Sequence, residues 1–166
     1  MQIDLSWLKL HPKSAEEFRL EKDYSGLELI QGVRLFGRVL VSLTVTNTGR
    51  LMVGQGEIKA GLEMDCDRCL GIFCQEIQMP ITVEFCEEEN RRFFKDEESF
   101  IYFEDPKVNL EPVVQGNILL SLPLRVLCSD ECLGLCSKCG QNFNQGKCQC
   151  RDEEIDPRWE ALKKML

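Results

Sequence analysis

The chain has 166 residues, of which 43% are apolar, a length and composition that fit one domain or one domain with a small appendage. Its 28 acidic and 20 basic residues leave a net charge of −8, which argues against broad electrostatic binding to RNA or DNA, because phosphate contacts come from lysine and arginine. The sequence shows no basic start followed by an apolar run and no apolar stretch of about 18 residues, so we predict a cytoplasmic protein without a signal peptide or membrane span.

The first predicted unit is an antiparallel hairpin. Residues 33–46 alternate between apolar and polar side chains, which predicts a half-buried strand. A turn signal begins at Asn47, and the alternation resumes in residues 50–66. Gly54 and Gly56 weaken this returning strand and indicate a bulge there.

Residues 72–86 predict a third strand. Pro80 lies within it and indicates an edge position or a break, because proline cannot donate to the ladder of hydrogen bonds. Cys74 and Cys86 are isolated on this apolar strand, so we expect them to be buried core cysteines rather than metal ligands.

The remaining elements are shorter. Residues 87–99 are dense in charge and predict a solvated loop, and residues 100–104 predict a short strand. A helix is expected from an N-cap at Asn109 until Pro123. A second short helix is expected from an N-cap at Asp156.

Together these elements predict an α+β fold, with an antiparallel β-sheet, a helix packed against it and a C-terminal cysteine-rich zinc-binding module. The expected division places the sheet and helix in residues 1–127 and the zinc module with its short helix in residues 128–166. The middle of the chain, residues 61–127, supplies the whole acidic excess.

Ten cysteines in a chain predicted for a reducing compartment indicate metal ligands rather than disulfides. Cys136 and Cys139 form a C-x-x-C turn, with Gly140 placed to adopt the positive φ that such a turn often needs. Cys148 and Cys150 follow after eight intervening residues that are rich in turn formers. Because zinc prefers four tetrahedral ligands and binds thiolates well, these four cysteines predict a complete local zinc site.

Four further cysteines form a C-x-x-C pair at Cys66 and Cys69 and a C-x-x-x-C pair at Cys128 and Cys132. The first pair lies at the turn between two predicted strands, and the second follows the predicted helix. A second zinc site that clamps the sheet to the C-terminal module uses all four, so we predict two zinc ions per chain. The alternative is an empty or partial site at Cys66 and Cys69.

A thiol oxidoreductase is the alternative interpretation of Cys66-Asp-Arg-Cys69. Such a motif needs its first cysteine at a helix N-terminus, where the dipole lowers the thiol pKa. Here the motif follows a strand, and we expect Asp65 and Asp67 to raise that pKa. His11 is the single histidine and the sequence has no Gly-rich phosphate loop, so no residue pattern demands an enzyme. We predict a non-enzymatic protein with no small-molecule substrate.

Five segments occur in order along the chain: CDRCL after a strand, ILLSLPLRVLC, CLGLCSKCGQNFN, CQC and DPRWEALKKML. Their order and spacing resemble the YceD family of large ribosomal RNA subunit accumulation proteins, most strongly over residues 62–86 and 109–162. The chain departs from the family pattern at Asn109 and Asn117, where we expect Asp and Glu. The resemblance implies a bacterial ribosome-biogenesis factor that supports the synthesis, processing or accumulation of 23S ribosomal RNA.

The resemblance also implies large ribosomal subunit precursors or 23S rRNA as partners, and a basic ribosomal protein fits the acidic chain. The candidate contact residues are Lys138, Lys147 and Arg151 in the zinc module, and Arg34 and Arg38 beside Phe36 on the first strand. We favour the zinc module, because its backbone is fixed by metal and its side chains lose little entropy on contact. A zinc-dependent protein-interaction adaptor without direct RNA contact is the alternative function.

Overall fold

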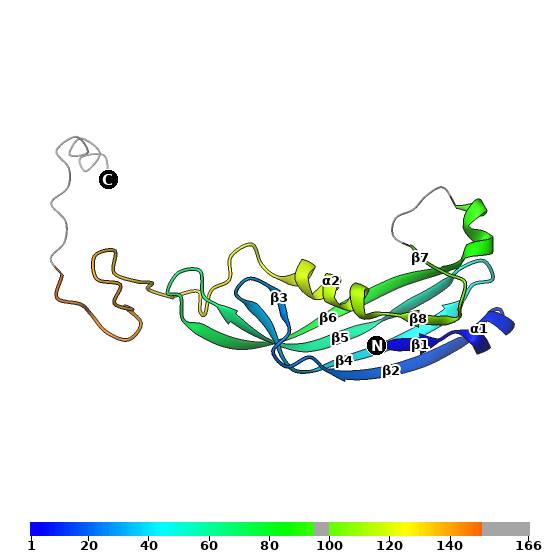
Figure 1. Ribbon diagram of the computed structural model, residues 1–166, viewed down its shortest axis with the longest axis horizontal. Coiled ribbons are helices and arrows are strands. Elements are labelled where there is room, and N and C mark those ends of the chain that lie inside the picture. Colours follow the sequence, from blue (N-terminus) through cyan, green and yellow to red (C-terminus); the bar gives the residue numbers. More distant parts are fainter. Residues whose placement is uncertain (95–99, 151–166) are drawn as a thin grey trace.

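The computed structural model describes residues 1–94 and 100–150, and it shows a long sheet whose one end continues into the cysteine-rich segment (Figure 1). The predicted helix that begins at Asp156 lies outside the described residues. In chain order the elements are β1 (Gln2–Asp4), α1 (Ser6–Leu10), β2 (Ala15–Asp23), β3 (Glu28–Ile30), β4 (Val33–Asn47), β5 (Met52–Asp65), β6 (Ile72–Glu87), the 3₁₀ helix η1 (Glu88–Phe93), β7 (Phe100–Phe103), β8 (Lys107–Asn109) and α2 (Glu111–Ser121).

The main sheet has the strand order β2-β4-β5-β6-β7 with β3 added to β4, and β1 pairs with β8 in a small second sheet. Every pair is antiparallel except β6 with β7, which run parallel from the pair Glu84–Phe100 onward. The predicted α+β class is therefore confirmed, with one parallel pair added. The connection between β6 and β7 begins with η1, a 3₁₀ helix, where the sequence predicted only a charged loop.

The β4–β5 hairpin follows the predicted alternation. The inward side chains are Val33, Leu35, Val39, Val41, Leu43 and Val45 on β4 and Met52, Ile58, Ala60, Leu62 and Met64 on β5. The bulge is not at Gly54 and Gly56, where the pairing is continuous, but in β4 between Phe36 and Leu40. A Cβ on Gly56 would lie 1.8 Å from the carbonyl oxygen of Ser42, so this glycine permits a close approach of the two strands.

The helix α2 lies along the sheet and buries Val114 and Ile118 against it (Figure 1). One edge of β6 pairs with β5, and the other edge pairs with β7 only over residues 84–87. Pro80 therefore lies where this second edge is unpaired, which agrees with the predicted edge position. None of the helices in the described part of the chain is long and apolar enough to cross a membrane.

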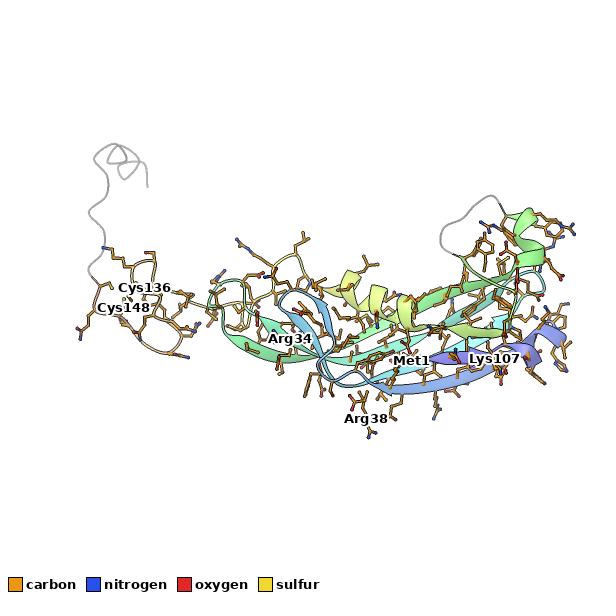
Figure 2. The ribbon with its side chains drawn as sticks, viewed as in Figure 1. Met1, Arg34, Arg38, Lys107, Cys136 and Cys148 are labelled. Carbon is orange, nitrogen blue, oxygen red and sulfur yellow. The ribbon has the colours of Figure 1, made fainter. Side chains whose placement is uncertain are left out.

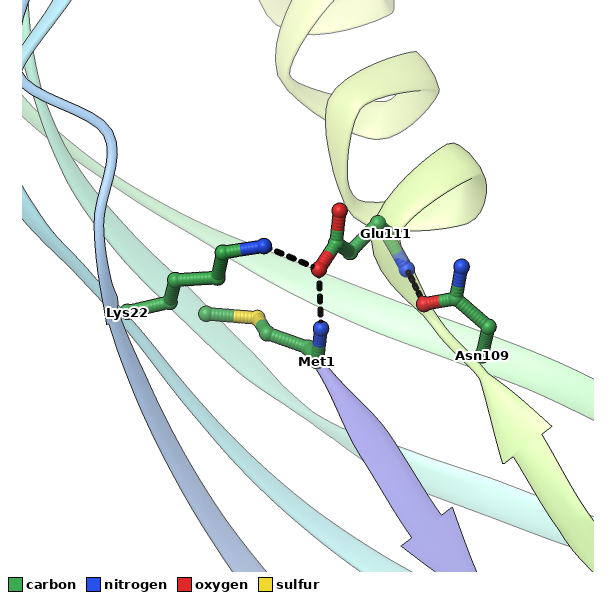
Figure 3. Close-up of polar contacts among 4 residues, drawn as sticks. All are labelled: Met1, Lys22, Asn109 and Glu111. Atoms are coloured by element: carbon green, nitrogen blue, oxygen red, sulfur yellow. Dashed lines mark hydrogen bonds and ion pairs between the residues drawn. The ribbon is translucent and has the colours of Figure 1, made fainter.

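The start of α2 is tied to two strands (Figure 3). Asn109 ends β8, and its side-chain oxygen accepts the N–H of Glu111 at 3.1 Å, so the helix begins slightly later than predicted. The carboxylate of Glu111 accepts hydrogen bonds from the Lys22 ammonium on β2 and from the amino group of Met1. These two hydrogen bonds lower the pKa of Glu111 to about 2.

Candidate metal centres

The structure gathers eight of the ten cysteines into two groups of four, and these are the same two sets that the spacing predicts. The proximal tetrad consists of Cys66, Cys69, Cys128 and Cys132. The distal tetrad consists of Cys136, Cys139, Cys148 and Cys150. Within each tetrad the four sulfur atoms lie within 4.8 Å of one another, so both sets can hold a metal ion.

The proximal tetrad has the spacing that a tetrahedral ion requires. The Sγ atoms of Cys66 and Cys132 are 3.8 Å apart, and those of Cys69 and Cys128 are 3.7 Å apart. Four thiolates at about 2.3 Å from one zinc ion lie about 3.8 Å from one another in a regular tetrahedron. These two distances match that value, and all four sulfur atoms lie within 4.8 Å of one another.

Two residues inside the first C-x-x-C motif join the sheet to the segment that carries the second cysteine pair. The Asp67 carboxylate accepts the N–H of Val126 at 2.7 Å, and the Asp67 N–H donates to the Val126 carbonyl at 2.8 Å. The Arg68 guanidinium donates to the carbonyl of Cys132 at 2.6 Å. The cysteine spacing alone does not indicate these positioning roles.

The two C-x-x-C turns share one backbone geometry. The N–H of Leu70 donates to the carbonyl of Cys66 at 2.8 Å, and the N–H of Gly140 donates to the carbonyl of Cys136 at 2.9 Å. Both donors have positive φ, +54° at Leu70 and +72° at Gly140, which confirms the conformation predicted for the glycine. The left-handed conformation costs a non-glycine residue about 1–2 kcal/mol, so the backbone is strained at Leu70 but not at Gly140.

One side chain connects the chain from Cys136 onward, which we call the distal segment, to the proximal tetrad. Asn144 lies in the insert between the two halves of the distal tetrad, and its Nδ2 donates to the Cys132 sulfur at 3.3 Å. Its Oδ1 accepts the N–H of Leu133 at 2.8 Å. The hydrogen bond from Asn144 is the main reason that the pKa of Cys132 is lowered. In the sequence this insert indicated only a turn.

Backbone N–H groups control ionisation of the first cysteine in each turn. Burial opposes ionisation of Cys66, but N–H groups, that of Cys128 foremost, outweigh it and lower the pKa of Cys66 to about 6. In the distal tetrad the N–H groups of Cys139 and Lys138 lower the pKa of Cys136 to about 6. The expectation that flanking aspartates raise the pKa at the first motif is therefore wrong, because the N–H groups point at the sulfur and favour the thiolate.

Other thiols in each tetrad resist ionisation. A hydrogen bond with Cys132 raises the pKa of Cys128 to about 12. A hydrogen bond with Cys139 raises the pKa of Cys150 to about 12. Four sulfurs at this spacing repel one another once ionised, and a divalent cation at their centre removes that repulsion and favours four thiolates.

The two tetrads differ in exposure. Three members of the proximal tetrad are buried, and they form a small core against which Phe73, Leu127 and Leu135 pack. In the distal tetrad, Cys139 and Cys150 are exposed. The proximal tetrad is thus part of the packed interior, whereas the distal tetrad lies at the surface.

The two isolated cysteines of β6 have different environments. Cys86 is buried, as predicted, and burial raises its pKa. The prediction that Cys74 is buried is wrong, because this residue is exposed, although it belongs to neither tetrad. Both residues have the same parity on the strand, but β7 and η1 pack only against the end of β6 that carries Cys86.

The candidate basic residues Arg34 and Arg38 of β4 are engaged in ion pairs. The Arg34 guanidinium lies 3.0 Å from the Glu63 carboxylate on β5, and Arg38 pairs with Glu21 on β2. Phe36 lies between the two arginines in sequence and is 51% exposed. The strand therefore combines an exposed aromatic ring with arginines whose charges are already neutralised.

The candidate lysines lie on a separate surface. Lys138 and Lys147 line a concave surface together with Cys136 and Cys148. In Figure 2, Cys136 and Cys148 lie beyond one end of the sheet, whereas Arg34 and Arg38 lie on the sheet itself. Arg151 lies outside the described residues.

Comparison with known proteins places this sequence in a family. Residues 54–166, which include both tetrads, match the profile of the family described as large ribosomal RNA subunit accumulation protein YceD. An uncharacterized protein of Mycobacterium tuberculosis is 30% identical over 145 residues, which cover 85% of this chain and 68% of the relative. An uncharacterized protein of Mycobacterium leprae is 25% identical over 142 residues, which cover 85% of this chain and 64% of the relative.

A plant relative carries a functional name. The large ribosomal RNA subunit accumulation protein YCED homolog 1, chloroplastic, of Arabidopsis thaliana is 30% identical over 56 residues, which cover 34% of this chain and 17% of the relative. No solved structure matches the chain. Because the family profile covers most of the chain, including every cysteine of the two tetrads, this protein belongs to the YceD family of large ribosomal RNA subunit accumulation proteins.

Proposed function

We propose that this protein is a non-enzymatic ribosome-biogenesis factor that supports the synthesis, processing or accumulation of 23S ribosomal RNA in the bacterial cytoplasm. The observation that carries this proposal is the family match over residues 54–166, because the name of that family states a role in accumulation of large-subunit ribosomal RNA. The matched segment includes β6, α2 and both tetrads, so the shared function resides in the part of the chain that the cysteines organise.

Two zinc ions, one in each tetrad, complete the proposal. The sulfur spacing in the proximal tetrad fits the tetrahedral geometry that zinc prefers. With four cysteine ligands, an ion has no open position for a water molecule or a substrate, which is typical of structural rather than catalytic zinc. The ion then supplies folding free energy and fixes the backbone.

The distal segment is the proposed contact surface for large-subunit precursors or 23S rRNA, through Lys138, Lys147 and Arg151. The ion pairs of Arg34 with Glu63 and of Arg38 with Glu21 favour this choice, because a phosphate contact on the sheet would have to displace a carboxylate. The sheet surface is the alternative contact site.

A second function is favoured by the charge of the chain. The net charge of −8 suits a zinc-dependent adaptor that binds a basic ribosomal protein without touching RNA. A thiol oxidoreductase has less support. Cys66 and Cys69 lie 3.8 and 3.7 Å from the sulfurs of a second cysteine pair, and such a group of four suits a metal ion with four ligands rather than a two-cysteine redox motif.

Co-sedimentation of the tagged protein with ribosomal precursors tests the proposal. The wild-type protein should sediment with large-subunit precursors, and replacement of Lys138, Lys147 and Arg151 together by Glu should abolish this while zinc content stays unchanged. Arg34→Glu/Arg38→Glu is the matched control and should leave sedimentation intact. Loss with the control variant alone would move the contact to the sheet. A wild-type protein that binds a ribosomal protein but no precursor RNA would support the adaptor instead.

A further inference from the structure

The C-terminal segment contains a groove of about 730 Å³ at the distal tetrad, three of whose cysteines line it, and we call it the distal groove. Its size lies within the range of about 300–1,000 Å³ that small-molecule sites occupy. The lining residues are Leu133, Leu135, Cys136, Ser137, Lys138, Phe143, Gly146, Lys147, Cys148 and Cys150.

The charges of the distal groove set it apart from the other hollows. Among the described residues, no carboxylate lines it, and its basic side chains are Lys138 and Lys147. Three concavities elsewhere, of 400–460 Å³, each include at least one glutamate. In a chain of net charge −8, the two lysines offset the charge of about −2 on an occupied distal tetrad, so the distal groove is close to neutral and its described lining has no carboxylate to repel a phosphate.

The groove also presents apolar surface to solvent. Leu133 is 68% exposed, and Leu135 and Phe143 are half-buried. The backbone around the ring is held in place, because the Phe143 N–H donates to the carbonyl of Gly134 at 2.9 Å. Unpaired bases stack on aromatic side chains, and each such contact contributes about 1–3 kcal/mol in single-strand binding proteins.

We infer that the distal groove binds an unpaired nucleotide of single-stranded RNA, with the base against Leu133 and Phe143 and the phosphates near Lys138 and Lys147. This inference rests on the proposed function and adds the form of RNA that is recognised. A duplex keeps its bases stacked inside, so it cannot offer a base to the groove.

Electrostatics predict how this binding depends on salt. Four thiolates around one divalent ion carry a net charge of about −2, which two lysines balance, so base stacking rather than charge provides most of the affinity. Two phosphate contacts to a single strand give a slope of about −1.4 in a plot of log affinity against log salt concentration. A protein that binds RNA mainly by charge shows a much steeper slope.

Fluorescence anisotropy with the zinc-loaded full chain tests the inference. The probe is a labelled single-stranded RNA of about eight nucleotides, compared with a duplex of the same sequence. Lys138→Glu/Lys147→Glu and, separately, Leu133→Ser should each weaken single-strand binding by about tenfold or more, because the first removes the charge contacts and the second removes an apolar contact with the base. Arg19→Glu is the matched charge control, because this exposed residue pairs with Glu17 on β2, and it should change binding less than about twofold.

Zinc content is measured for every variant, so that a lost metal site is distinguished from a lost contact. Equal affinity for the single strand and the duplex, or unchanged affinity in both groove variants, would overturn the inference. Failure of the wild type to bind the oligonucleotide while it still co-sediments with large-subunit precursors would overturn the groove assignment and leave the proposed function standing. Capture of a ribosomal protein by the groove in place of RNA would also overturn it.

Discussion

Loss of the proximal tetrad should destabilise the whole sheet, whereas loss of the distal tetrad should not. The perturbation is Cys66→Ser/Cys69→Ser, with Cys136→Ser/Cys139→Ser as the matched control. The proximal tetrad joins the β5–β6 turn to the segment after α2, and Cys69 and Cys128 are 59 residues apart in the chain. An ion there cross-links a long loop that contains β6, β7 and α2, so it restricts the unfolded chain.

The magnitude follows from the loop length. Closing a loop of about 60 residues lowers the entropy of the unfolded chain by an amount equivalent to about 4 kcal/mol at 25 °C, in the chain-entropy description of cross-links. In the distal tetrad, eight residues separate the two cysteine pairs, and the closed loop contains no strand of the sheet. For a chain of this size, about 4 kcal/mol corresponds to a decrease in melting temperature of about 8–16 °C.

Urea unfolding of the zinc-loaded proteins, followed by far-ultraviolet circular dichroism of the sheet, measures this difference. The proximal variant should lose about 4 kcal/mol in free energy of unfolding, and the distal variant should stay within about 1 kcal/mol of the wild type. Equal losses in the two variants, or no loss in the proximal variant, would show that the proximal tetrad does not clamp the sheet.

Three further predictions follow from other parts of the structure. Elemental analysis should find two zinc ions per chain, and a chelator should remove the ion of the exposed distal tetrad first, so a single release phase or one ion per chain would contradict the proposed assignment. The folded pKa of Glu111 is lowered to about 2, mainly by its hydrogen bond from Lys22. The ionised Glu111 carboxylate therefore stabilises the fold above the usual glutamate pKa of about 4.3, and this stabilisation is lost as the pH falls toward 2. Glu111→Gln should make the free energy of unfolding depend less on pH in that window. Gly56→Ala should cost at least about 2 kcal/mol in urea unfolding because its Cβ would meet the Ser42 carbonyl, whereas Gly116→Ala, which has open space in α2, should stabilise by about 0.5–1 kcal/mol.

The sequence by itself determined the features that depend on near neighbours in the chain. Alternation identified the inward face of β4 and β5, because strand side chains point to opposite faces at every second residue. The glycine after Cys139 indicated the left-handed turn, which requires only local backbone freedom. Counting cysteines in short motifs indicated two sets of four, because a tetrahedral ion needs that number.

Other features depended on contacts between distant segments, and only the tertiary structure decided them. The strand β2 pairs with β4 along its length, although its run of charged residues shows little alternation. Cys74 and Cys86 share one strand and one parity, yet only the end of β6 that carries Cys86 is covered. Asp67 and Asn144 position the proximal tetrad through partners 59 and 12 residues away. Periodicity reports which side chains share a face, but which part of that face is buried, and which polar groups meet across it, is set by packing between segments far apart in the chain.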